Sequence, residues 1–151
     1  MNRCQVLGLG HQFQILTKRS ARLLSLSPRI DWTPNIWMGV SVENQRWTSR
    51  INDLVQVPAI IRFLSCEPLL SMVDIEWIFD PTGYVACGGE PECSCQGCRD
   101  CSQWPRNEDG AYESIHWVIC GGESGRKARP MHPDWARCLR DQCRAAGVAF
   151  F

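Results

Sequence analysis

The chain has 151 residues, of which 44% are hydrophobic and 21% charged, proportions typical of a folded globular domain rather than a disordered chain. Its 16 basic residues balance 16 acidic ones, so no global charge attracts nucleic acid or an anionic membrane, and a nucleic-acid partner would need a local patch. The start lacks a secretory signal and no run of about twenty apolar residues occurs, so we expect a cytoplasmic protein without membrane contact.

Strands are predicted at 13–18, 36–42 and 59–66, which are apolar runs rich in β-branched and aromatic residues. Each of these runs ends in polar residues. Near-continuous apolar strands are typical of a parallel sheet that is covered on both faces, so we expect the three segments to pair in such a sheet.

Helical patterns fill the intervals between these strands. A short helix is expected to begin at Ser20, and a second follows Asn44, a residue suited to the N-cap. The apolar residues of the second helix recur on one face: Trp47, Ile51, Leu54 and Val55. Strand, helix and strand at this spacing indicate the βα unit with its right-handed crossover.

The C-terminal part repeats this pattern. A fourth strand is predicted at 115–120, and the next helix has His132 at its start, Pro133 at its first position and Gly147 just past its end. The expected buried stripe of this helix consists of Trp135, Cys138, Leu139 and Cys143. Residues 148–151 then open a fifth strand.

These elements predict an α/β fold in one domain over 1–151, a partial βα barrel of parallel strands alternating with helices. A barrel of eight βα units needs about 200 residues or more, so the chain is expected to supply only part of one. A complete small doubly wound sheet is the alternative. The strand edges that a partial barrel leaves open would allow self-association.

Residues 80–114 interrupt the pattern and are interpreted as a cysteine-rich insertion in a loop at the barrel rim. Four of its cysteines fall close together: Cys93, Cys95, Cys98 and Cys101. Their C-x2-C spacing favours structural zinc, with Cys87 as a further ligand. The same spacing matches three positions of an iron–sulfur motif, for which Cys66 or Cys120 would have to supply the fourth ligand. Free or disulfide-bonded thiols are the third interpretation.

Polar groups follow every predicted strand, and the C-terminal ends of parallel strands meet at one edge of the sheet, where ligands bind. The candidate ligand-binding residues at this edge are Lys18, Ser41, Glu43, Glu67, Gly121, Gly122, Glu123, Ser124 and Arg129. The sequence thus predicts a small-molecule site at the edge, although it identifies no catalytic residue.

The glycine pair would let the backbone approach a carboxylate or phosphate. Glu123 would accept hydrogen bonds from an amine or a ribose hydroxyl, and Arg129 would counter an anion. Two interpretations without chemistry stay open. The glycines would simply turn the chain, with Glu123 solvated or paired with a lysine at the edge, and a salt bridge between Lys18 and Glu67 would explain both of those residues.

Four blocks of the sequence resemble a known family: "HQFQILTKRSARL", "PNIWMGVSVENQ", "RFLSCEPLL" and "WVICGGESGRKARPMHPDWARCLRDQC". In this order they are similar to the phage gp-thirty-seven/gp-sixty-eight family of unknown function, and the likeness covers nearly all the chain except the cysteine-rich insertion. The resemblance implies a βα barrel similar to radical S-adenosylmethionine enzymes. In such members an N-terminal cysteine motif holds a 4Fe–4S cluster that cleaves S-adenosylmethionine reductively.

The family's cysteine motif lies upstream of the region that matches His11, so the resemblance implies a C-terminal portion that is inactive alone. The iron–sulfur cluster and S-adenosylmethionine would then be cofactors of the full-length protein only. By similarity, the residues that face substrate and cofactor are Lys18, Ser41, Glu43, Glu67 and Glu123. The alternative function is a zinc-stapled binding module whose cysteine loop contacts a protein or nucleic-acid partner.

Overall fold

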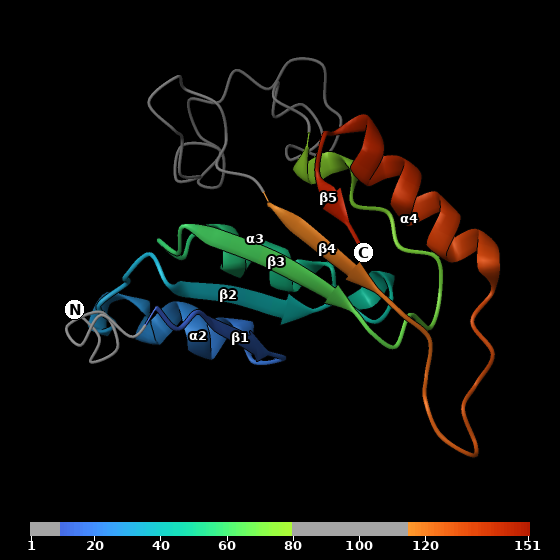
Figure 1. The fold of residues 1–151 in the computed structure, drawn as a ribbon, viewed down its shortest axis with the longest axis horizontal. Helices are drawn as coiled ribbons and strands as arrows, with labels where there is room; N and C mark the ends of the chain where they lie inside the picture. Colours follow the sequence, from blue (N-terminus) through green and yellow to red (C-terminus); the bar gives the residue numbers. More distant parts are fainter. Residues whose placement is uncertain (1–9, 80–114) are drawn as a thin grey trace.

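A computed structural model describes residues 10–79 and 115–151, and within them five parallel strands form one sheet (Figure 1). The strands are β1 (Phe13–Thr17), β2 (Ile36–Ser41), β3 (Ile61–Cys66), β4 (Trp117–Cys120) and β5 (Ala149–Phe150). They lie in the sheet in the same order as in the chain. The predicted α/β fold with parallel strands and interspersed helices is therefore confirmed.

Within the described residues, three α-helices and three short 3-10 helices connect these strands. They are α2 (Ser20–Leu26), η1 (Ser27–Arg29), η2 (Gln45–Trp47), α3 (Ser49–Val55), η3 (Glu76–Ile78) and α4 (Pro133–Ala145). In the part of the chain that the structure describes, no helix is long and apolar enough to cross a membrane.

All three α-helices pack against the same face of the sheet, which we call the helix face. The strand residues in the core are even-numbered in β2, β3 and β4: Met38, Val40, Leu64, Cys66 and Val118. They form a single cluster with helix residues Leu23, Ile51, Leu54, Val55, Leu139 and Cys143. Because side chains alternate along a strand, the odd-numbered residues of these strands point to the opposite face, which we call the open face.

Sequential strand order and helices on one face are the features of a barrel wall. A doubly wound sheet instead has helices on both faces and reverses its strand order at a switch point. The wall is not closed into a barrel, because within the described residues β1 and β5 each pair with a strand on one side only. The structure therefore supports the partial barrel over the doubly wound alternative.

The expectation that both faces of every strand are covered is wrong for β1. Its apolar side chains are exposed, at 39% for Phe13, 45% for Ile15 and 47% for Leu16. The physical reason is that β1 is an edge strand, and no described element packs beyond it. By contrast, β2 and β3 in the centre of the sheet are almost fully buried.

Several of the predicted element bounds need correction, and β1 and β2 each end one residue earlier than predicted. Strands β3 and β4 begin two residues later than predicted because pairing starts at Ile61 and Trp117. Asn44 is an N-cap, as predicted, since its side chain accepts a hydrogen bond from the Arg46 amide, but it starts the 3-10 helix η2. Trp47 therefore belongs to η2 rather than α3.

The ends of α4 confirm the sequence-based prediction. His132 is the N-cap and its ring accepts a hydrogen bond from the Asp134 amide, while Pro133 occupies the first helical position. Gly147 follows the C-cap with φ of +69°, a conformation that favours glycine. The predicted stripe is buried at Leu139 and Cys143 and half-buried at Trp135 and Cys138.

An aromatic cluster covers the middle of the open face. The Trp37 and Trp117 rings meet edge-on with centroids 6.4 Å apart, and the Phe63 ring lies 5.9 Å from that of Trp117. Gly39 makes room for this packing, since a Cβ atom there would lie 2.5 Å from two ring atoms of Phe63. The cluster fixes β2, β3 and β4 relative to one another from the face opposite the described helices.

We expect Gly39→Ala to lower the free energy of unfolding by about 1–3 kcal/mol, because the added methyl group must displace the Phe63 ring. Urea unfolding followed by tryptophan fluorescence measures the change. Gly122→Ala is the matched control, because its Cβ would make an ordinary contact at 3.5 Å from Met131. Equal stability of the two variants would contradict the close approach at Gly39.

Candidate ligand site at the C-terminal edge of the sheet

The predicted site residues lie at the C-terminal edge of the sheet, because all strands run in the same direction. Lys18 follows β1, Glu43 follows β2, Glu67 follows β3, and Gly121 begins the segment after β4. Figure 1 shows that this last segment, which connects β4 to α4, extends beyond the edge. Two pairs of these residues are in contact, Lys18 with Glu43 and Glu67 with Gly121.

Glu43 is the central ion-pairing residue of the edge. Its Oε1 lies 2.5 Å from Nζ of Lys18 and its Oε2 lies 2.9 Å from Nη1 of Arg50. The same Arg50 nitrogen donates to the Ser41 carbonyl at 2.6 Å, and its guanidinium lies 4.1 Å from the centre of the Trp47 ring. The carboxylate thus connects β1, β2 and α3.

The charge of Glu43 is maintained although the residue is only 6% exposed. Burial would raise its pKa, but the Lys18 hydrogen bond, a backbone hydrogen bond and the Lys18 and Arg50 charges together lower it below 4.5. Its stabilising effect is therefore present above pH 4.5 and is lost as the pH falls through the lowered pKa. Both carboxylate oxygens are engaged, so Glu43 acts as an anchor of the edge.

Ser41 is the last residue of β2, two positions before Glu43, and is 2% exposed. It pairs in register with Ser65, which is 4% exposed, and the Ser65 carbonyl accepts a hydrogen bond from the Val42 amide at 2.9 Å. Both serines belong to the open face by strand alternation. The sequence-based prediction placed Ser41 at the edge, and the structure adds that it is buried there.

Glu67 is the exposed carboxylate of the edge. Its side chain lies against Gly121, where a Cβ atom would overlap the carboxyl group. Backbone hydrogen bonds join the segments after β3 and β4 at this point. The Leu69 amide donates to the Gly121 carbonyl at 2.8 Å, and the Gly121 amide donates to the Cys66 carbonyl at 3.3 Å. The glycine is therefore needed for close approach between the segments after β3 and β4.

No ion pair of Glu67 occurs among residues 10–79 and 115–151. Lys18 forms its salt bridge with Glu43 and not with Glu67, the partner that the sequence suggested. The reason is geometric, because Glu43 follows β2, the direct neighbour of β1, whereas β3 is one strand further away. Among the described acids of this edge, Glu67 is thus the one without an ion pair.

Glu123 is occupied by Arg129 of its own loop. The carboxylate accepts hydrogen bonds from the Arg129 amide at 2.7 Å, from Nε at 2.9 Å and from Nη2 at 2.5 Å. These hydrogen bonds lower the pKa of Glu123 from 4.5 to about 2. The partner of Glu123 is therefore an arginine and not a lysine, as one interpretation of the sequence suggested. This ion pair holds together the loop between Gly122 and α4.

The other predicted residues of this loop are exposed. Gly122 and Ser124 face solvent, and Gly125, which sequence reasoning did not single out, turns the chain with φ of +102°. The Ala128 amide donates to the Gly125 carbonyl at 3.1 Å and completes the turn. The backbone at Gly122 is consequently accessible from the edge.

Three thiols lie close together behind the edge, on the helix face. Cys66 and Cys120 pair in register on β3 and β4, and Cys143 of α4 interacts electrostatically with both. Burial raises the pKa of all three, to about 11 for Cys143. They are neutral thiols at neutral pH and therefore weak nucleophiles.

The proposed metal ligands of the cysteine-rich insertion lie outside the described residues: Cys93, Cys95, Cys98 and Cys101. Within the described ranges, no group of three or more His, Cys, Asp or Glu side chains is arranged to hold a metal ion. A zinc or iron–sulfur site thus stays a sequence-based prediction.

Sequence reasoning missed Arg50, which is 9% exposed although it carries a charge. A signal was present, because Arg50 is three residues after Trp47 and four before Leu54, on the apolar side of the helical pattern. A basic residue at such a position needs a buried acidic partner, and Glu43 is the nearest carboxylate in the preceding strand end.

The fold and the edge define an α/β protein with an open parallel sheet and polar groups at the C-terminal strand ends. Comparison with protein families matches residues 6–151 to a family described as "Protein of unknown function (DUF5131)". The chain therefore belongs to the DUF5131 family. Comparison with the curated proteins and with the solved structures gave no match.

We expect Glu43→Gln to lower the free energy of unfolding by about 3 kcal/mol, because it leaves the buried Arg50 guanidinium without a countercharge. Lys18→Gln is the control and should cost at most about 1 kcal/mol, since the Lys18 side chain is 60% exposed. Urea unfolding measures both changes. An equal loss in the two variants would contradict the central role of the Glu43–Arg50 pair.

The Glu123–Arg129 ion pair should persist in acid. Because the pKa of Glu123 is lowered to about 2, the pair is complete above pH 4.5 and is lost as the pH falls through about 2. A carbon-13 NMR titration of the Glu123 carboxyl group measures this midpoint. Arg129→Gln should return it toward 4.5, whereas Arg126→Gln should leave it unchanged, and a midpoint insensitive to Arg129 would refute the assignment.

Proposed function

We propose that the C-terminal edge of the sheet binds a small molecule that carries an amine group. The main support for this proposal is the exposed Glu67 carboxylate, which has no cationic partner among the described residues and lies against Gly121. A carboxylate in this position accepts hydrogen bonds from an ammonium group. The other two acids of the edge, Glu43 and Glu123, are already neutralised by side chains of the protein itself.

The electrostatics of the edge favour a ligand with charge of both signs. Lys18 pairs with Glu43 but remains 60% exposed, so its ammonium is within reach of an anionic ligand group. The exposed backbone at Gly122 offers a close approach without a side chain. An amino acid group, with its amine toward Glu67 and its carboxylate toward Lys18 or the Gly122 backbone, satisfies both requirements.

S-adenosylmethionine carries such an amino acid group, and we propose it as the ligand. The support is the sequence resemblance to the phage family and to radical S-adenosylmethionine barrels, together with strands that end in polar groups at one edge. On this proposal the chain is the C-terminal part of a barrel enzyme, in which Glu67 orients the ligand amine. The described cysteines do not fit a 4Fe–4S cluster, because within the described ranges no group of three or more His, Cys, Asp or Glu side chains is arranged to hold a metal ion.

The second candidate function is a zinc-stapled module that contacts a protein or nucleic-acid partner. The observation that favours it is the C-x2-C spacing of Cys95, Cys98 and Cys101. These residues lie outside the described ranges, so the proposal rests on the sequence alone. Self-association through the edges of β1 and β5 is compatible with either function.

We expect the chain to bind S-adenosylmethionine in a calorimetric titration and Glu67→Gln to weaken binding about tenfold, the loss for one charge-assisted hydrogen bond. Glu76→Gln, which changes an exposed acid in η3, is the matched control and should bind normally. Absence of binding would contradict the proposal. Zinc that copurifies with the chain and is lost in the Cys95→Ser, Cys98→Ser double variant would then support the alternative.

The radical assignment needs a separate test on the complete gene product. Reconstituted with iron, sulfide and a reductant, it should cleave S-adenosylmethionine, and Glu67→Gln should reduce the rate. Binding without cleavage would retain the ligand site and refute the radical chemistry.

A further inference from the structure

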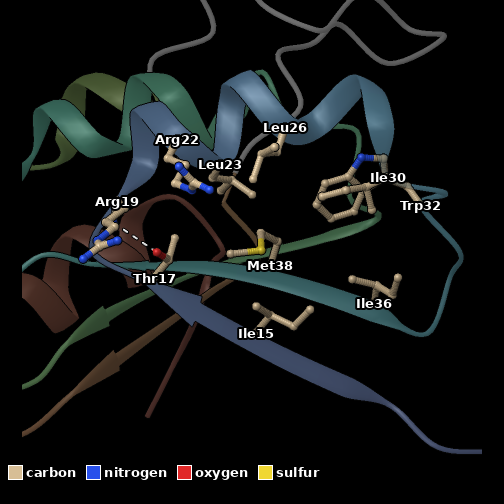
Figure 2. A pocket seen from close by; sticks show the side chains of 10 residues that line it. All are labelled: Ile15, Thr17, Arg19, Arg22, Leu23, Leu26, Ile30, Trp32, Ile36 and Met38. Atoms are coloured by element: carbon tan, nitrogen blue, oxygen red, sulfur yellow. Dashed lines mark hydrogen bonds between the residues drawn. The ribbon is translucent and has the colours of Figure 1, made fainter.

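A groove on the helix face lies between α2 and the first two strands (Figure 2). Thr17 and Arg19, which line one end of it, flank Lys18 of the C-terminal edge in the chain. Its volume is about 340 Å³, at the lower end of the range for small-molecule pockets. Helix α2 forms one wall, and β1 and β2 form the other. The groove is open because no described element covers β1, whose Ile15 side chain is 45% exposed.

The two ends of the groove differ in chemistry. Figure 2 shows Ile30, Trp32 and Ile36 at one end and Thr17 and Arg19 at the other. The Trp32 indole N–H donates to the Ser27 carbonyl at 3.0 Å, so the ring offers an apolar surface to the groove without an unsatisfied donor. One end is therefore apolar, and the other is polar and basic.

Two arginines, Arg19 and Arg22, line the groove one helical turn apart. In the described part of the chain neither forms an ion pair with a carboxylate. The nearby acid Asp53 accepts a 2.6 Å hydrogen bond from the Ser20 hydroxyl of α2. Among the described residues these two positive charges thus lack a carboxylate partner, and they complement an anion.

We propose that this groove binds a free aliphatic carboxylate of medium chain length. Its hydrocarbon tail lies between Leu26, Ile30 and Ile36, and its carboxylate lies at the end of Arg19 and Arg22. The tail gains from removal of its apolar surface from water, and the guanidinium groups donate charge-assisted hydrogen bonds to the carboxylate. A neutral amphiphile would lack the charge-assisted hydrogen bonds, and a cationic one would be repelled by the two arginines.

The test is a calorimetric titration of the whole chain with monomeric decanoate, compared with decanol and decyltrimethylammonium. The Nε1–H NMR signal of Trp32, assigned by its loss in Trp32→Phe, reports whether the ligand occupies the groove. We expect decanoate to shift this signal and to bind about fivefold more tightly than decanol, with decyltrimethylammonium weakest.

The double variant Arg19→Gln, Arg22→Gln should bind decanoate no more tightly than decanol. Arg29→Gln is the matched control, because Arg29 is exposed in η1 but does not line the groove, and it should bind decanoate normally. Equal affinity for all three amphiphiles, or no shift of the Trp32 signal, would overturn the proposal. So would a dimer that forms in the absence of ligand and blocks decanoate binding, because a second copy would then fill the groove.

Discussion

One constraint underlies the rest of the structure: even-numbered side chains of β2, β3 and β4 enter a single core with the three described α-helices. This core places Met38, Leu64 and Val118 on the helix face and leaves the odd-numbered residues on the open face. Since the strands are parallel and adjacent in chain order, their C-terminal ends lie at one edge. The positions of Glu43 and Glu67 are consequences of this arrangement.

The acids of the edge have divided roles. Glu43 is held by Lys18 and Arg50 and links β1, β2 and α3, whereas Glu123 closes its own loop through Arg129. Glu67 remains exposed beside Gly121, where any larger residue would collide with the Glu67 side chain. Neutralised acids stabilise the edge, and in the proposed function the remaining carboxylate supplies specificity for a ligand amine. On the helix face, Arg19 and Arg22 form no ion pair with a described carboxylate, and their charges distinguish the groove from the buried core.

Much of this architecture was predictable because short-range rules govern it. Apolar runs located the strands, and Pro133 and Gly147 located the ends of α4 by their backbone preferences. The pairing of Glu43 with Arg50 and of Glu123 with Arg129 was not predicted, because choosing among many possible partners requires distances between elements. The exposure of β1 was missed for a related reason, since an apolar run does not distinguish an edge strand from a central one.

The most direct measurement of the parallel arrangement at the edge is NMR detection of couplings across individual hydrogen bonds in the whole chain. We expect the Val42 amide to couple to the Ser65 carbonyl, and the Gly121 amide to couple to the Cys66 carbonyl. These two couplings would place the ends of β2, β3 and β4 together. Couplings of Val42 or Gly121 to carbonyls at the opposite ends of the neighbouring strands would contradict the shared edge and the site built on it.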